Sequence, residues 1–266
     1  MASYDQYETI QIDVSAGVAT CTLNRPQAMN AVTRQMHKEL ETLFGQFSGD
    51  KDVRAIVLTG AGRAFCAGGD VKEMDATDVA DDRPAGIFDS GARHVVNNLL
   101  SIEQPIIAAV NGVAVGLGAT LALLCDVVFM AESARIGDTH ISIGLVPGDG
   151  GTVIWPLLVG PARAKEYLLT GDLIPAPEAE RIGLVNHVVA DDQVLDDALA
   201  FASRLADGPT MAIRLTKLAI QRTILQQALQ SMDVSLALET ITGTSHDYTE
   251  ATTAWSEKRT PEFKGR

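Results

Sequence analysis

The first apolar residues of the chain alternate with polar ones, a spacing typical of half-buried β-strands. Two such segments, residues 10–14 and 18–23, are separated by an Ala-Gly pair and predict a hairpin. Residues 33–47 instead carry apolar side chains three and four positions apart. That spacing predicts an amphipathic helix, with Thr33 as its N-cap. The chain is therefore expected to open with strand, strand and helix.

The middle of the chain alternates short apolar runs with glycine-rich stretches. The apolar runs predict buried strands at residues 55–58, 106–110 and 127–130. Glycine-rich stretches, at residues 60–70 and 112–118, follow the first two of these runs. Residues 119–124 are apolar on every side, which indicates a buried helix. This part of the chain thus repeats a strand, a glycine-rich loop and a helix.

Helical spacing dominates the remainder of the chain. It predicts helices at residues 87–100, 193–205, 210–225, 229–241 and 248–258, and the acidic, non-periodic residues 75–86 predict a surface loop. Repeated strand and helix units followed by helices favour an α/β fold. We expect residues 1–190 to form the α/β core and residues 191–266 to form a C-terminal helical region.

Composition narrows the classes of partner. The net charge of −13 over 266 residues argues against nucleic acid or an anionic membrane as the main partner, because phosphate binding needs a basic face. No apolar run reaches the ~18 residues of a membrane span, and the first residues contain no apolar segment of a secretory signal. The three cysteines are odd in number and lack CxxC spacing, so no disulfide framework or metal site is expected. We expect a cytoplasmic protein.

Two glycine-rich loops are candidates for chemistry. In residues 63–70 and 111–119, a strand ends in small residues and a helix follows. Small residues allow the backbone to approach a ligand, and a helix N-terminus leaves N–H groups without intrahelical partners. Two such ends facing each other can stabilise an oxygen that becomes negative in a transition state. The structural alternative is a pair of tight turns.

Five motifs, in order along the chain, resemble those of the crotonase (enoyl-CoA hydratase/isomerase) superfamily. They are LNRP at 23–26, AFCAGGD at 64–70, QPIIAAVNG at 104–112, GLVPGDGG at 144–151 and EKR at 257–259. The resemblance covers essentially the whole chain. It implies a ββα spiral core and a C-terminal helical trimerisation region, in a homotrimer or a dimer of trimers.

The resemblance also assigns residues to an acyl-CoA substrate, with coenzyme A as part of the substrate and no tightly bound cofactor. The N–H groups of Gly69 and Leu117 would form the oxyanion hole. The backbone around Ala64, Cys66 and Ala67 would bind the adenine. The side chains of Arg25, Lys72 and Lys258 would lie near the phosphates.

The chain departs from this family at both catalytic glutamates. Thr120 and His140 occupy the positions where a typical hydratase has its two glutamates. An imidazole can accept a proton near neutral pH, and a neighbouring carboxylate can fix its tautomer. We therefore interpret His140 and Asp149, which lies inside the PGDGG segment, as a proton-transfer pair with a neutral imidazole as the base. The structural alternative is a histidine that caps the turn.

Three functions remain open from the sequence. The first is an enoyl-CoA hydratase/isomerase-family enzyme that acts on an acyl-CoA thioester. The second is hydrolytic C–C cleavage of a β-dicarbonyl compound, because residues 97–105 and 144–150, with Trp155-Pro156, resemble the β-diketone hydrolase branch of the superfamily. The third is an acyl-CoA-binding homologue without activity, since both glutamates are absent.

Overall fold

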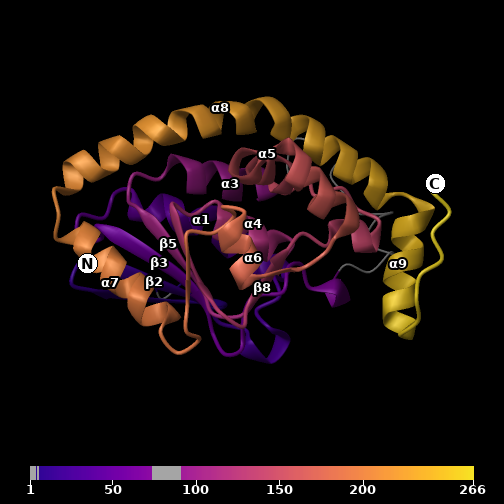
Figure 1. Cartoon of the computed structure of the whole chain (residues 1–266), viewed down its shortest axis with the longest axis horizontal. Coiled ribbons are helices and arrows are strands. Elements are labelled where there is room, and N and C mark those ends of the chain that lie inside the picture. Colours follow the sequence, from indigo (N-terminus) through magenta and orange to yellow (C-terminus); the bar gives the residue numbers. More distant parts are fainter. Residues whose placement is uncertain (1–3, 5, 74–90) are drawn as a thin grey trace.

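The computed structural model describes residues 4, 6–73 and 91–266, and its largest element is a six-stranded sheet (Figure 1). The strand order is β1-β2-β3-β5-β7-β10. The first pair, β1 and β2, is antiparallel and forms the predicted hairpin, and the other pairs are parallel. The strands are β1 (Ile10–Ser15), β2 (Val18–Leu23), β3 (Ala55–Gly60), β5 (Ile106–Val110), β7 (Val127–Ala131) and β10 (His187–Val189).

A second sheet of four short strands lies beside the first, in the order β4-β6-β8-β9. These strands are β4 (Ala64–Cys66), β6 (Val113–Val115), β8 (Arg135–Gly137) and β9 (Ile174–Pro175). A long strand, a short strand and a helix recur three times, as β3-β4-α3, β5-β6-α4 and β7-β8-α5. The helices are α3 (Gly91–Ser101), α4 (Leu117–Leu123) and α5 (Gly151–Thr170), with the short η2 (Val71–Glu73) before α3. This repeat confirms the predicted ββα spiral.

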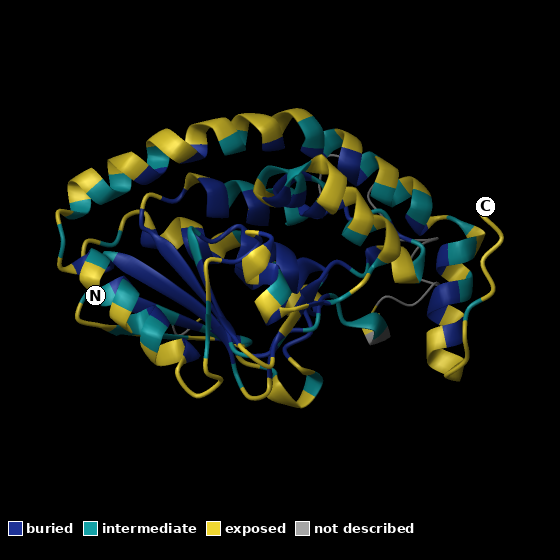
Figure 2. Cartoon of the chain, in the orientation of Figure 1, coloured by how far each residue is buried: buried dark blue, intermediate teal, exposed yellow. Residues whose placement is uncertain are grey.

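The core forms where apolar strands are covered by helices on their faces. Every residue of β3 and β5 is buried, and α7 (Val194–Ala206) packs against both (Figure 2). The first helix, α1 (Arg34–Phe47), buries the apolar stripe that its spacing predicted. The hydroxyl of Thr33 accepts the N–H of Met36 at 3.2 Å, which confirms the predicted N-cap.

The C-terminal region is dominated by one long helix, α8 (Thr210–Gly243), which arches over α3 and α5 (Figure 1). The expectation of two separate helices here is wrong. The Gln-Gln-Ala segment between them contains good helix formers, and Ala228 is fully buried, so nothing interrupts the helix. The helix is followed by α9 (His246–Glu257), which stands at one end of the molecule.

Helix α5 follows a turn at residues 148–150. This helix was not predicted from the sequence; it contains Pro156 and Pro161 and departs from helical geometry at Gly160. The remaining short helices are η1 (Pro26–Ala28), η3 (His140–Ile143) and α6 (Ala176–Arg181). The predicted loop at 75–86 lies outside the described residues. In the part of the chain that is described, no helix is both long enough and apolar enough to cross a membrane.

Candidate active site

The first glycine-rich loop turns the N–H of Gly69 away from its neighbouring strand. Val32 donates its N–H to the carbonyl of Gly68 at 2.8 Å and accepts the N–H of Asp70 at 3.0 Å. In this parallel bridge, Val32 is hydrogen-bonded to the two residues that flank Gly69. The N–H of Gly69 itself therefore points away from Val32. Gly68 has φ +81°, and a Cβ there would lie 2.9 Å from the carbonyl oxygen of Val115, so only glycine fits.

The second loop presents the N–H of Leu117 at the start of α4. Leu117 is the first residue of this buried helix, so its N–H has no partner within the helix. The preceding residue, Gly116, has φ +54°, and a Cβ there would lie 3.9 Å from Cα of Gly68. The two glycine-rich loops therefore meet, as the sequence predicted.

A chamber of about 460 Å³ opens beside both loops. Four of the residues that line it are Gly69, Leu117, His140 and Asp149, the set proposed for catalysis from the sequence. The rest of the lining comes from the residues before α1, from α1, α3 and α8, and from the end of the first loop and η2. These residues are Val32, Thr33, Arg34, His37, Lys38, Glu41, Gly91, Ala92, Leu236, Glu239, Asp70 and Glu73. The fold thus brings the two loops and the histidine–aspartate pair into one space.

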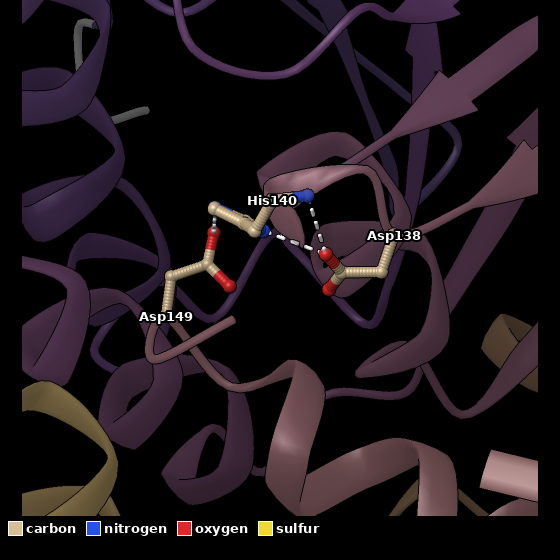
Figure 3. Close-up of side chains that lie close together, drawn as sticks. All are labelled: Asp138, His140 and Asp149. Atoms are coloured by element: carbon tan, nitrogen blue, oxygen red, sulfur yellow. Dashed lines mark hydrogen bonds and ion pairs between the residues drawn. The ribbon is translucent and has the colours of Figure 1, made fainter. Parts of the chain in front are cut away.

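His140 lies between two buried carboxylates (Figure 3). Its Nδ1 is 2.6 Å from Oδ1 of Asp138, and its Nε2 is 3.5 Å from Oδ2 of Asp149. His140 begins η3, Asp138 directly follows β8, and Asp149 lies in the turn before α5. The expected pairing of His140 with Asp149 is therefore present as an ion pair, and Asp138 takes the other ring nitrogen.

These carboxylates change the charge of the ring. Burial alone would lower the pKa of His140, but Asp149 and Asp138 on its two sides, with a smaller effect of Glu239, raise that pKa to about 10. Burial also raises the pKa of Asp149, against the opposing effect of the imidazolium. The ring is therefore protonated at neutral pH. A neutral imidazole base, which the sequence analysis expects, is not the form that these surroundings favour.

Asp149 also contacts Thr120, the residue that the resemblance matches to the first catalytic glutamate. The hydroxyl of Thr120 donates to Oδ1 of Asp149 at 3.3 Å, while Oδ2 faces His140. One carboxylate therefore lies between the two side chains that stand at the family's glutamate positions. The arrangement offers a proton acceptor, Asp149, next to a proton donor, the His140 imidazolium.

Sequence reasoning missed Asp138 and Glu239. Asp138 is two residues before His140, a spacing that lets a side chain accept the backbone N–H of the later residue, as it does here at 3.2 Å. That local signal was available. Glu239 comes from α8, far along the chain, and no sequence pattern indicates that it lines the chamber.

The residues expected to bind coenzyme A fall into two groups. Ala64 and Cys66 form β4, with Ala67 next to them, and the amide of the buried Asn30 donates to the carbonyl of Ala64 at 2.8 Å. Burial raises the pKa of the Cys66 thiol to about 12, so the thiol is neutral. This backbone is part of the first loop and is held by the Asn30 side chain.

The candidate cations are more scattered. Arg25 pairs with Asp70 at 3.1 Å. Lys72 lies in η2, and its side chain is outside the described part of the structure. Lys258 ends α9 in a left-handed conformation and is exposed. Among the described residues, neither Arg25 nor Lys258 lines the chamber.

The buried cluster also has the residue types of a metal site. Asp138, His140 and Asp149 each offer a ligand atom, and these atoms lie within 4.8 Å of one another. However, the 2.6 Å contact of Nδ1 with Asp138 is a hydrogen bond, which places a proton on that nitrogen. Shared protons account for the geometry of the cluster, and we assign it no metal.

Comparison with known proteins places the chain among close relatives. The family model of enoyl-CoA hydratase/isomerase matches residues 13–266. A probable enoyl-CoA hydratase of Rhizobium meliloti (strain 1021) is 38% identical over 260 residues, which cover 98% of this chain and 99% of the relative. A 1,2-epoxyphenylacetyl-CoA isomerase of Escherichia coli (strain K12) is 37% identical over 261 residues, 97% of this chain and 99% of the relative.

A solved structure agrees with the fold. The crystal structure of an enoyl-CoA hydratase/isomerase from Mycobacterium paratuberculosis superposes with a TM-score of 0.88 at 36% identity. The superposition covers 94% of this chain and 99% of that one. The two proteins therefore share their architecture along nearly their whole length.

Proposed function

The chain belongs to the enoyl-CoA hydratase/isomerase family, and from this premise we propose that it hydrates an enoyl-CoA thioester with Asp149 and His140 in place of two glutamates. The observation that carries the proposal is the position of Asp149. Its carboxylate lies between Thr120 and His140, in the same chamber as the N–H groups of Gly69 and Leu117.

The thioester carbonyl is bound by the N–H groups of Gly69 and Leu117. Both groups lack partners in their own elements, and both residues line the chamber. When a nucleophile adds to the β-carbon, the electron pair of the double bond moves onto the thioester oxygen. Preorganised donors stabilise that negative oxygen, and one such donor contributes about 10²–10³-fold in rate.

Proton transfer divides between the two members of the pair. The carboxylate of Asp149 takes a proton from water as the water oxygen bonds to the β-carbon. The His140 imidazolium gives its Nε2 proton to the α-carbon, and the proton held by Asp149 then restores the imidazolium. The raised pKa of Asp149 brings that carboxyl nearer the operating pH, which suits a general base.

Coenzyme A binds along the first loop in this proposal. The backbone of Ala64, Cys66 and Ala67 contacts the adenine, and Arg25, Lys72 and Lys258 lie near the phosphates. The pairing of Arg25 with Asp70 leaves further N–H groups of the guanidinium for a phosphate. Charge-assisted contacts of this kind contribute about 1.5–3 kcal/mol each.

The association of copies is part of the proposal. Helix α8 exposes large apolar side chains along its length, including Met211, Leu215, Ile220, Val234 and Ile241. Exposed apolar surface of this extent marks contact sites on proteins. We place these side chains at the interface of a homotrimer or a dimer of trimers. A monomer in light scattering at micromolar concentration contradicts this arrangement.

The rival hypotheses make different demands on His140. Hydrolytic C–C cleavage with an imidazole base needs a neutral ring, which the flanking carboxylates disfavour. Loss of the enoyl absorbance of crotonyl-CoA, measured beside a panel of β-diketones, separates hydration from C–C cleavage. Turnover of any of these compounds excludes a silent acyl-CoA-binding homologue.

A pair of variants at Leu117 tests the oxyanion hole. Leu117→Pro removes the N–H at the first position of α4, where proline is compatible with a helix. Leu117→Ala keeps that N–H and removes the side chain. We expect kcat on crotonyl-CoA to fall about 10²–10³-fold in Leu117→Pro and by less than about tenfold in Leu117→Ala. Equal rates in the two folded variants contradict the role of this N–H.

A further inference from the structure

Asp138 has no role in the family's glutamate mechanism, yet it is buried against the reacting pair. We propose that Asp138 is a positioning residue, which holds the His140 ring with Nε2 facing Asp149 and the chamber. This inference rests on the proposed function of His140 and Asp149. Three observations support it: the contacts of Asp138, the packing of the ring and the placement of charge around it.

Asp138 contacts both the backbone and the ring of His140. Its Oδ1 accepts the backbone N–H of His140 at 3.2 Å and lies 2.6 Å from the ring Nδ1. Two bonds from one oxygen fix both the backbone and the ring of the same residue. The second oxygen, Oδ2, has no hydrogen-bond partner among the described residues and packs against Gly151. A Cβ on Gly151 would lie 2.3 Å from Oδ2, so the backbone at the start of α5 packs closely against the carboxylate of Asp138.

The ring so held packs beside the oxyanion loop. A Cβ on Gly116 would lie 3.4 Å from Cε1 and 3.8 Å from Nδ1 of His140. Gly116 immediately precedes Leu117, whose N–H is proposed to bind the carbonyl. A rotation of the ring would therefore disturb its distance both to Asp149 and to the bound thioester. The orientation of the His140 ring therefore determines its distance to Asp149 and to the thioester.

Asp138 also decides which nitrogen exchanges its proton. The charged groups facing the ring are Asp138 from the β8–η3 link, Asp149 from the turn before α5, and Glu239 from α8. A carboxylate at Nδ1 keeps the proton there, because the hydrogen bond of one ring nitrogen determines the state of the other. Nε2 is then the nitrogen that gives and takes a proton next to Asp149.

A purely structural role is the alternative to be excluded. Asp138 could simply satisfy the N–H at the start of η3, in which case its loss would reduce stability and nothing else. The measurements must therefore report the ring itself, in addition to the amount of folded protein.

Asp138→Asn is the main variant, and Asp172→Asn, at an exposed carboxylate after α5, is its matched control. We expect kcat on crotonyl-CoA to fall about 10–10²-fold, with KM within about threefold. Loss of a flanking negative charge lowers the pKa of His140, so the alkaline limb of the rate should move down by roughly one to three pH units. An unshifted alkaline limb, or a loss of rate equal to the loss of folded protein, overturns the proposal.

Nitrogen NMR of the wild-type His140 ring tests the proposal without any substrate. We expect Nδ1 to remain protonated while Nε2 titrates. If Nδ1 loses its proton first, Asp138 does not set the tautomer and the proposal is wrong. This measurement holds even if Asp138→Asn does not fold or if crotonyl-CoA is not turned over, so failure of the proposed function remains distinguishable.

Discussion

Two ionic clusters of this chain differ in their balance of charge. One lies under α8 and contains Lys217 and Asp126. The other lies beside the chamber and contains Asp138, His140 and Asp149. The first joins residues 91 positions apart in the chain, whereas His140 and Asp149 of the second line the chamber. The comparison separates an ion pair that holds elements together from one that can move a proton.

The cluster under α8 is balanced: it has one positive and one negative charge, and both groups make further hydrogen bonds. Nζ of Lys217 is 2.8 Å from Oδ2 of Asp126 and donates to the carbonyl of Gln104 at 2.8 Å. Asp126 also accepts the N–H of Ile106 at 2.7 Å and the amide of Gln221 at 3.3 Å. One positive charge meets one negative charge, and the contacts tie α8 to the large sheet.

The cluster beside the chamber has more carboxylates than cations. One imidazole faces Asp138 and Asp149, and Glu239 adds a third negative group nearby. The flanking carboxylates raise the pKa of His140 against the effect of its burial, whereas burial is the main cause that raises the pKa of Asp149, with a smaller contribution from Asp138. The cluster of Asp138, His140 and Asp149 therefore binds a proton that can be transferred, whereas the pair of Lys217 and Asp126 has, within the described part of the chain, no additional carboxylate to accept one.

The largest expected effect comes from removing the acceptor of the unbalanced cluster. Asp149→Asn keeps the shape of the side chain but cannot accept the proton, so kcat on crotonyl-CoA should fall about 10²–10⁴-fold. Asp126→Asn makes the same chemical change in the balanced cluster. It should lower the melting temperature and leave kcat of the folded protein within about twofold. A kcat of Asp149→Asn within threefold of wild type would remove Asp149 from the mechanism.

A smaller effect is expected from breaking the balanced pair. Lys217→Met leaves Asp126 charged without its partner, and we expect the free energy of unfolding to fall by about 2–3 kcal/mol, measured by denaturant titration. Lys217→Met with Asp126→Asn should cost less than Lys217→Met alone, since no unpaired charge remains. Arg181→Met, which breaks an exposed pair with Glu178, is the control and should leave the free energy of unfolding almost unchanged. Equal losses at both sites would show that burial of the Lys217 pair has no consequence.

The smallest effect concerns the hydroxyl that supports Asp149. Thr120→Val keeps the volume of the side chain and removes the hydrogen bond to the Asp149 carboxylate, which at 3.3 Å is long and therefore weak. We expect kcat to change by about three- to tenfold. Thr249→Val, on the exposed side of α9, provides the control. If Thr120→Val loses as much activity as Asp149→Asn, the hydroxyl itself takes part in the reaction.

Local patterns predicted those parts of the fold and site that depend on neighbouring residues. The hairpin, the helix capped by Thr33 and the buried α4 follow from the period of apolar side chains. The two glycine-rich loops follow from small residues between strand and helix. His140 and Asp149 were found because they stand in a family motif, and the structure places them 3.5 Å apart.

Other features required the folded chain. Helix α5 contains two prolines and a break in helical geometry at Gly160, and it packs against η3, α4 and α8, contacts that periodicity does not report. The charge of His140 depends on Asp149 and Glu239, which arrive from separate elements, and on burial of the ring. The amino-acid sequence by itself determined the family, the first hairpin, α1 and the buried α4, and it selected His140 and Asp149 as the candidate pair. Only the tertiary structure decided which nitrogen faces which carboxylate and where the proton resides, because both depend on how η3 folds against the turn before α5, on Glu239 from the remote α8 and on burial of the ring.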